Sequence, residues 1–130
     1  MRLPNHVRMP RIGQCYQWSE LPGKGHGYVR FEDGRVVCAN LKPELNPNAP
    51  EVILVGHGPL REKWAEILCN QDHNIAFEVY LKQATQARNR WKYVGEYVVE
   101  NWSEAADEIR QHGIKANRQD IVRVIKLRRK

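Results

Sequence analysis

The chain has 130 residues, 42% of them hydrophobic and 28% charged, which excludes a disordered segment and predicts one folded domain over residues 11–130. No apolar run approaches the roughly 18 to 20 residues of a membrane-spanning helix, and the first residues lack the apolar segment of a signal peptide, so we expect a cytoplasmic protein. The net charge of +6 resides in residues 115–130, which form either a phosphate-binding surface or a charged, solvated terminus.

The first half of the chain is predicted to form a loosely held N-terminal arm over residues 1–10 and then four strands. Runs of β-branched, aromatic and apolar residues indicate these strands at residues 13–18, 28–31, 35–41 and 52–55. Asp33 and Gly34 join the second strand to the third, because this pair favours a tight hairpin turn. Residues 21–27 contain three glycines and a proline, and residues 42–50 contain three prolines, so both segments are predicted to be loops.

The second half of the chain is predicted to form two short helices and three strands. Pro59 suits the first position of a helix, and apolar residues recur at helical spacing from there through residue 70. A second helix is expected with Ser103 as its N-cap and with Gly113 beyond its last turn. The strands are expected at residues 75–81, 91–101 and 121–127. Because residues 91–101 are largely apolar on both faces, this strand should be central in its sheet.

The predicted order of elements defines the fold class. Six or seven strands and two short helices occur without the βαβ alternation of a parallel sheet and without internal repeats. We therefore predict an α+β fold with a mixed, strongly twisted, barrel-like sheet and two short helices.

The sequence lacks the familiar signatures of catalysis. The glycines at 23, 25 and 27 do not have the spacing of a phosphate-binding loop, and the five histidines and three cysteines are too scattered for a metal site. We therefore expect no catalytic residues, no metal and no cofactor. A small enzyme that processes a nucleotide, with Cys38, His57 or Asp33 taking part, stays open as an alternative.

Aromatic and basic residues alternate in several segments, at residues 28–31, 61–64 and 88–93. Aromatic rings stack on exposed bases while arginine and lysine bind phosphates, so a surface that binds nucleic acid needs both kinds of residue together. Any single ring is explained more readily as part of the core, because large rings dominate cores. The prediction of nucleic-acid binding therefore depends on the clusters.

Two segments resemble a known family. The sequence Trp-Lys-Tyr-Val-Gly-Glu-Tyr-Val-Val-Glu-Asn-Trp at residues 91–102, followed by residues 122–129, resembles the end of SRA domains, where a Tyr-x-Gly-x-Tyr-x-Val strand leads to a strand ending in Leu-Arg-Arg. Upstream, residues 52–58, a helix through Trp64, and residues 74–80 are similar to the layout of SRA-like domains in modification-dependent restriction endonucleases. The resemblance implies a PUA-like β-barrel that acts in restriction or defence, binds duplex DNA and flips a modified cytosine, such as 5-methylcytosine, into a pocket.

The resemblance and the charge pattern together indicate candidate site residues. The base pocket is expected to contain Trp18, Tyr28, Phe31 and Asp33. The residues expected to bind the nucleic-acid backbone are Arg30, Arg88, Arg90, Lys92, Arg123, Lys126, Arg128 and Arg129. Duplex DNA is the expected partner, any cleavage would come from a nuclease domain or chain, and no membrane partner is expected. Alternatives are a PUA-like domain that binds RNA and a module that binds another protein.

Overall fold

The computed structural model describes residues 9–84 and 90–130, so Arg88 and most of the expected N-terminal arm lie outside the described residues. The helices are the short 3-10 helix η1 (Trp18–Glu20), α1 (Pro59–Asn70) and α2 (Ala106–Ala116). The strands are β1 (Cys15–Tyr16), β2 (Val29–Glu32), β3 (Arg35–Leu41), β4 (Val52–Gly56), β5 (Phe77–Lys82), β6 (Trp91–Ser103) and β7 (Ile121–Arg129). None of the described helices is long and apolar enough to cross a membrane.

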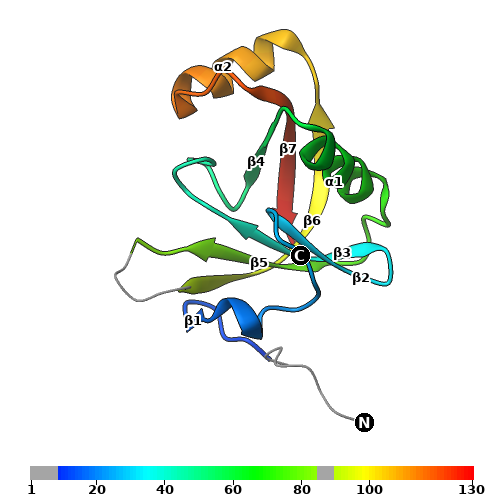
Figure 1. Cartoon of the computed structure of the whole chain (residues 1–130), viewed down its shortest axis with the longest axis vertical. Coiled ribbons are helices and arrows are strands. Elements are labelled where there is room, and N and C mark those ends of the chain that lie inside the picture. The colour runs from blue at the N-terminus through cyan, green and yellow to red at the C-terminus, as the bar shows by residue number, and fades with distance from the viewer. Residues whose placement is uncertain (1–8, 85–89) are drawn as a thin grey trace.

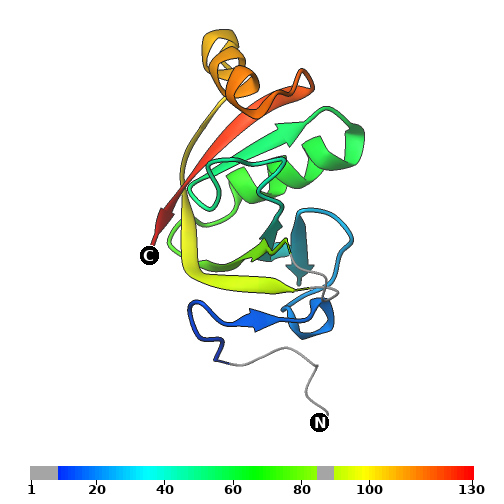
Figure 2. The ribbon, with the colours of Figure 1, turned by 90° about the vertical axis from the view of Figure 1, so that its left-hand side faces the viewer.

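The strands form one strongly curled sheet in the order β2-β3-β5-β6-β7-β4, and the short β1 pairs with β6 (Figure 1 and Figure 2). Strands β3 and β5 run parallel and the other pairs run antiparallel, so the sheet is mixed. The predicted α+β class with two helices and a curled mixed sheet is confirmed, and the sheet forms a half-barrel. Within the described residues, β2 and β4 are its two edges.

The longest strand, β6, lies in the middle of the sheet, as its two apolar faces predicted. It pairs with β5 along its first half and with β7 along its second half. Trp91, Tyr93, Tyr97 and Val99 alternate along it and are all buried. The rings that suggested a binding surface are therefore mainly core residues, with Trp91 as an exception that also reaches a cavity.

The two helices cover different parts of the sheet. Ala65, Leu68 and Cys69 of α1 belong to the main core together with buried residues of β3, β4 and β6. Helix α2 packs against β7 at the far end of the β6–β7 pair, away from α1 (Figure 1). Helix α1 thereby fills the curl of the sheet, and its N-terminal turn stays at the surface.

Both predicted ends of the second helix are wrong. Ser103 is the last residue of β6, and its Oγ accepts a hydrogen bond from the backbone N–H of Ala105 (3.0 Å), so α2 begins only at Ala106. Gly113 lies inside α2, where a Cβ would come within 2.8 Å of the carbonyl oxygen of Arg118. Glycine is thus needed for close packing of the helix on the turn that follows, and Asn117 (φ 53) ends the helix in the left-handed conformation.

Candidate functional site

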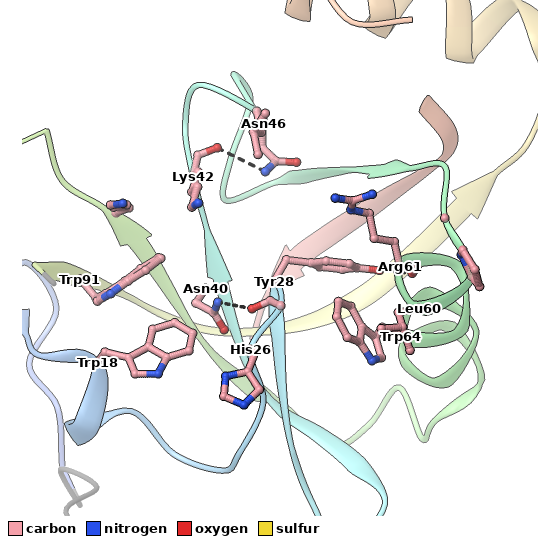
Figure 3. A pocket seen from close by; sticks show the side chains of 15 residues that line it. Trp18, His26, Tyr28, Asn40, Lys42, Asn46, Leu60, Arg61, Trp64 and Trp91 are labelled. Atoms are coloured by element: carbon pink, nitrogen blue, oxygen red, sulfur yellow. Dashed lines mark hydrogen bonds between the residues drawn. The ribbon is translucent and has the colours of Figure 1, made fainter. Parts of the chain in front are cut away.

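A cavity of about 670 Å³ opens between the start of β2, the ends of β3 and β5, and the N-terminal turn of α1. Figure 3 shows that its aromatic residues lie at two ends. Trp18 and Trp91 lie at one end, and Tyr28, Trp64 and Arg61 lie at the other. Sidechains from four separate parts of the chain therefore meet around one space.

The pairing of strands explains why the mouth of the cavity is positively charged. Leu41 pairs with Leu81 in the parallel β3–β5 ladder, so the next residues, Lys42 and Lys82, lie side by side where the two strands end. Arg61 of α1 lines the same cavity, whereas its lining contains no aspartate or glutamate. An anionic group would therefore meet cations and no carboxylate at this mouth.

The end of the cavity at Trp18 is supported by a buried arginine. The predicted strand over residues 13–18 ends early, and Trp18 begins η1, so that its ring packs on Trp91 with 5.4 Å between ring centroids. The guanidinium of Arg30 lies 4.6 Å from the Trp18 ring. It donates hydrogen bonds to the carbonyl oxygens of Pro22 (3.0 Å) and Gly23 (2.6 Å). Arg30 is only 7% exposed and thus holds Trp18 and the glycine loop instead of facing a phosphate.

The opposite end of the cavity consists of Tyr28 and Trp64 in an edge-to-face contact, with 5.8 Å between ring centroids. The Tyr28 hydroxyl donates a hydrogen bond to the carbonyl oxygen of Arg61 (2.8 Å), and burial raises the pKa of Tyr28 well above its usual range. Gly27 lets the Trp64 ring lie directly on the backbone, because a Cβ there would sit 2.5 and 2.7 Å from two atoms of that ring. The Tyr28 hydroxyl therefore stays protonated, and the two rings pack tightly beside Arg61.

Asn40 forms part of the cavity lining between these two ends and was not predicted. Its backbone N–H donates to the carbonyl oxygen of Tyr28 (2.9 Å), and its Nδ2 donates to the carbonyl oxygen of Gly27 (2.6 Å). Its Oδ1, like Nε1 of Trp91, is buried and has no hydrogen-bond partner among the described residues. The sequence feature that could have indicated Asn40 is its position as an asparagine within the otherwise apolar second half of the 35–41 strand.

Only two of the four predicted pocket residues line the cavity, namely Trp18 and Tyr28. Phe31 packs against the main core, and Asp33 is exposed in the hairpin turn with a φ of 52°. The hairpin extends away from Tyr28, so Asp33 lies roughly 15 Å along the chain from it. Phe31 and Asp33 are therefore not brought into this cavity by the fold.

Two predicted phosphate contacts on β7 are engaged within the protein. Arg123 is 7% exposed, forms ion pairs with Glu66 and Glu104, and stacks over the Trp102 ring at 4.3 Å. The Nζ of Lys126 lies 2.7 Å from a carboxylate oxygen of Glu108. Hydrogen bonds from these cations hold the pKa values of Glu66 and Glu108 below their usual range. Arg123 and Lys126 thus each have a carboxylate partner within the protein.

The other described basic candidates lie in two places. Arg90 is exposed and Lys92 is half-buried, and they flank Trp91, which lines the cavity. Arg128 and Arg129 are exposed at the end of β7 and do not line the cavity. Of the residues predicted to bind the nucleic-acid backbone, Arg90 and Lys92 are therefore the two that are adjacent in sequence to a cavity residue.

Of the three residues named for the enzyme alternative, Cys38 is buried, whereas His57 and Asp33 are exposed. Cys38 and Cys69 are buried, and burial raises the pKa of both thiols, which disfavours the reactive thiolate. His73 is hydrogen-bonded to the carbonyl oxygen of Cys69 (2.7 Å), and exposed His57 lies 3.3 Å from Glu62. Among residues 9–84 and 90–130, no cluster of three histidine, cysteine, aspartate or glutamate side chains could hold a metal ion.

Comparison of the chain with protein families, with curated proteins and with solved structures finds no match in any of the three. The likeness to SRA domains therefore stays a prediction from the sequence.

Proposed function

We propose that this domain binds duplex DNA and reads a modified cytosine, with 5-methylcytosine as the expected base, by taking it out of the helix and into the cavity. The observation that carries this proposal is the combination of four aromatic side chains with Lys42, Arg61 and Lys82 around one space that has no carboxylate in its lining. The volume of about 670 Å³ lies within the range of roughly 300 to 1,000 Å³ that is typical of small-molecule sites.

The energetics of base flipping fit this arrangement. Extruding a base costs a few kcal/mol, and stacking on an aromatic ring returns about 1 to 3 kcal/mol per base. Trp18 and Trp64 are half-buried and each leaves part of its ring accessible. Lys42 and Lys82 lie at the mouth, where the flanking phosphates of an extruded nucleotide would pass.

A binding titration with labelled duplexes tests the proposal. Matched duplexes with one 5-methylcytosine or with unmodified cytosine are titrated at several salt concentrations, with RNA of the same sequence and free 5-methyl-dCMP as competitors. We expect tighter binding of the modified duplex and a loss of affinity with rising salt. Replacing Lys42 or Lys82 with Ala should each reduce the slope of log affinity against log salt by about 0.9 if each contacts one phosphate.

Two aromatic variants separate the cavity from the rest of the surface. Trp18→Ala should weaken binding of the modified duplex by about 10-fold or more, because it removes a stacking ring. Trp102→Ala is the matched control, since Trp102 is exposed and lies outside the cavity. Absence of binding to any duplex at low salt would refute the proposal, and preferential competition by RNA would favour the RNA-binding alternative.

A further inference from the structure

Only one of the two polar side-chain atoms of Asn40 is hydrogen-bonded, although Asn40 is a cavity residue and only 5% exposed. Buried polar atoms in proteins are almost always paired, so an unpaired buried acceptor in the lining of a cavity calls for an explanation. Asn46, which lines the same cavity, provides the contrast. Its Oδ1 accepts from the backbone N–H of Leu54 (2.8 Å), and its Nδ2 donates to the carbonyl oxygen of Lys42 (3.3 Å).

The orientation of the Asn40 amide is set by its neighbours. Nδ2 lies 2.6 Å from the carbonyl oxygen of Gly27, which can only accept a hydrogen bond. Exchanging the amide oxygen and nitrogen would place two acceptors against each other, so the nitrogen must face Gly27. The group left for a ligand is therefore Oδ1, which is an acceptor and requires a ligand with an N–H or O–H donor.

We propose that Oδ1 of Asn40 accepts a hydrogen bond from the exocyclic amino group of the cytosine that enters the cavity, which makes Asn40 a specificity-determining residue. This inference rests on the proposed function. Thymine carries the same 5-methyl group as 5-methylcytosine but has a carbonyl oxygen in place of the amino group. That oxygen would face Oδ1 without a hydrogen between them, so Asn40 selects 5-methylcytosine against thymine.

A lining side chain has to move before the amino group can reach Asn40, because Oδ1 is covered in the structure. His26 is the candidate for this movement. It is exposed, it lines the cavity beside Gly27, and its ring makes no hydrogen bond with the described residues (Figure 3). Displacement of its ring would break no hydrogen bond described within the protein.

The decisive experiment measures the preference of the protein for 5-methylcytosine over thymine when each lies opposite guanine in an otherwise identical duplex. The T·G mismatch is the easier of the two pairs to open, so the cost of flipping alone favours thymine. We expect the wild-type protein to prefer 5-methylcytosine by about 10-fold or more. Asn40→Leu, which has a similar shape and no acceptor, should lose this preference, whereas Trp102→Ala, which lies outside the cavity, should keep it.

Each outcome is interpretable. A wild-type protein that prefers 5-methylcytosine over cytosine but not over thymine overturns the role of Asn40 and leaves the proposed function standing. A protein that binds none of the duplexes overturns both. If Asn40→Leu fails to fold, the wild-type protein is tested with two free nucleotides that need no base flipping, 5-methyl-dCMP and its 5-methyl-2-pyrimidinone counterpart, which lacks only the amino group. Equal affinity for the two overturns the inference.

Discussion

Replacing Arg30 with Met should lower the free energy of unfolding by about 3 kcal/mol. Arg30 donates to the carbonyl oxygens of Pro22 (3.0 Å) and Gly23 (2.6 Å), and hydrogen bonds from a charged donor contribute roughly 1.5 to 3 kcal/mol each. Its contact with the Trp18 ring at 4.6 Å adds about 0.5 to 2 kcal/mol. The cost of burying a guanidinium, which also lowers the pKa of Arg30, offsets part of this gain, so the net effect is smaller than the sum.

Urea unfolding followed by tryptophan fluorescence measures this change, because Trp18 is next to the altered site. Arg35→Met is the matched control, since Arg35 is exposed in the same hairpin, and it should change the free energy of unfolding by less than about 0.5 kcal/mol. Arg30→Met should also weaken binding of the modified duplex, because Trp18 loses the group that holds its ring. An Arg30→Met protein as stable as the Arg35→Met protein would refute the reasoning.

Gly27→Ala should destabilise the protein by about 1 to 3 kcal/mol in thermal unfolding, because the new Cβ would sit 2.5 and 2.7 Å from atoms of the Trp64 ring. Adding Trp64→Leu should restore part of that loss, and a purely additive double variant would contradict the predicted clash. Hydrogen bonds from basic side chains lower the pKa values of Glu66, Glu108 and Asp120 in the folded protein. The melting temperature should therefore be highest above the ordinary values of 4.5 and 3.8 and should fall as the pH drops through the lowered values. A melting temperature that stays constant under acid titration to about pH 2 would contradict this.

Local signals in the sequence were enough to place most elements of the fold. The Asp33-Gly34 turn has positive φ angles of 52° and 79°, as a tight hairpin requires, and Pro59 opens α1 as predicted. The parallel pairing of β3 with β5 could not be predicted in the same way. Strands β3 and β5 are separated in the chain by β4 and α1. Their pairing follows from how α1 packs into the curled sheet.

The residues of the cavity could be predicted only in part, because residues that are close in sequence do not always face the same space. Tyr28, Phe31 and Asp33 were predicted together as residues of one hairpin, and Trp18 was added because it is nearby in sequence. Only Trp18 and Tyr28 line the cavity. Along an extended strand, neighbours in sequence alternate between faces and move apart quickly. Asn40 could have been noticed in the sequence, because a polar residue in a buried strand requires hydrogen-bond partners. Which of its side-chain atoms stays unpaired depends on Gly27, which the fold brings beside it.

The distribution of charge shows most clearly why position in the sequence does not locate a binding surface. The C-terminal segment holds the excess positive charge of the chain, but Arg123 and Lys126 are paired with carboxylates, and Lys130 donates to the carbonyl oxygen of Asn74 (2.9 Å). Lys42 and Lys82, in contrast, are far apart in the sequence and meet at the mouth of the cavity because two parallel strands end there. Among the described residues, neither lysine forms an ion pair, and cations without carboxylate partners attract phosphate most strongly. We therefore expect DNA to pass across the ends of β3 and β5 instead of along β7.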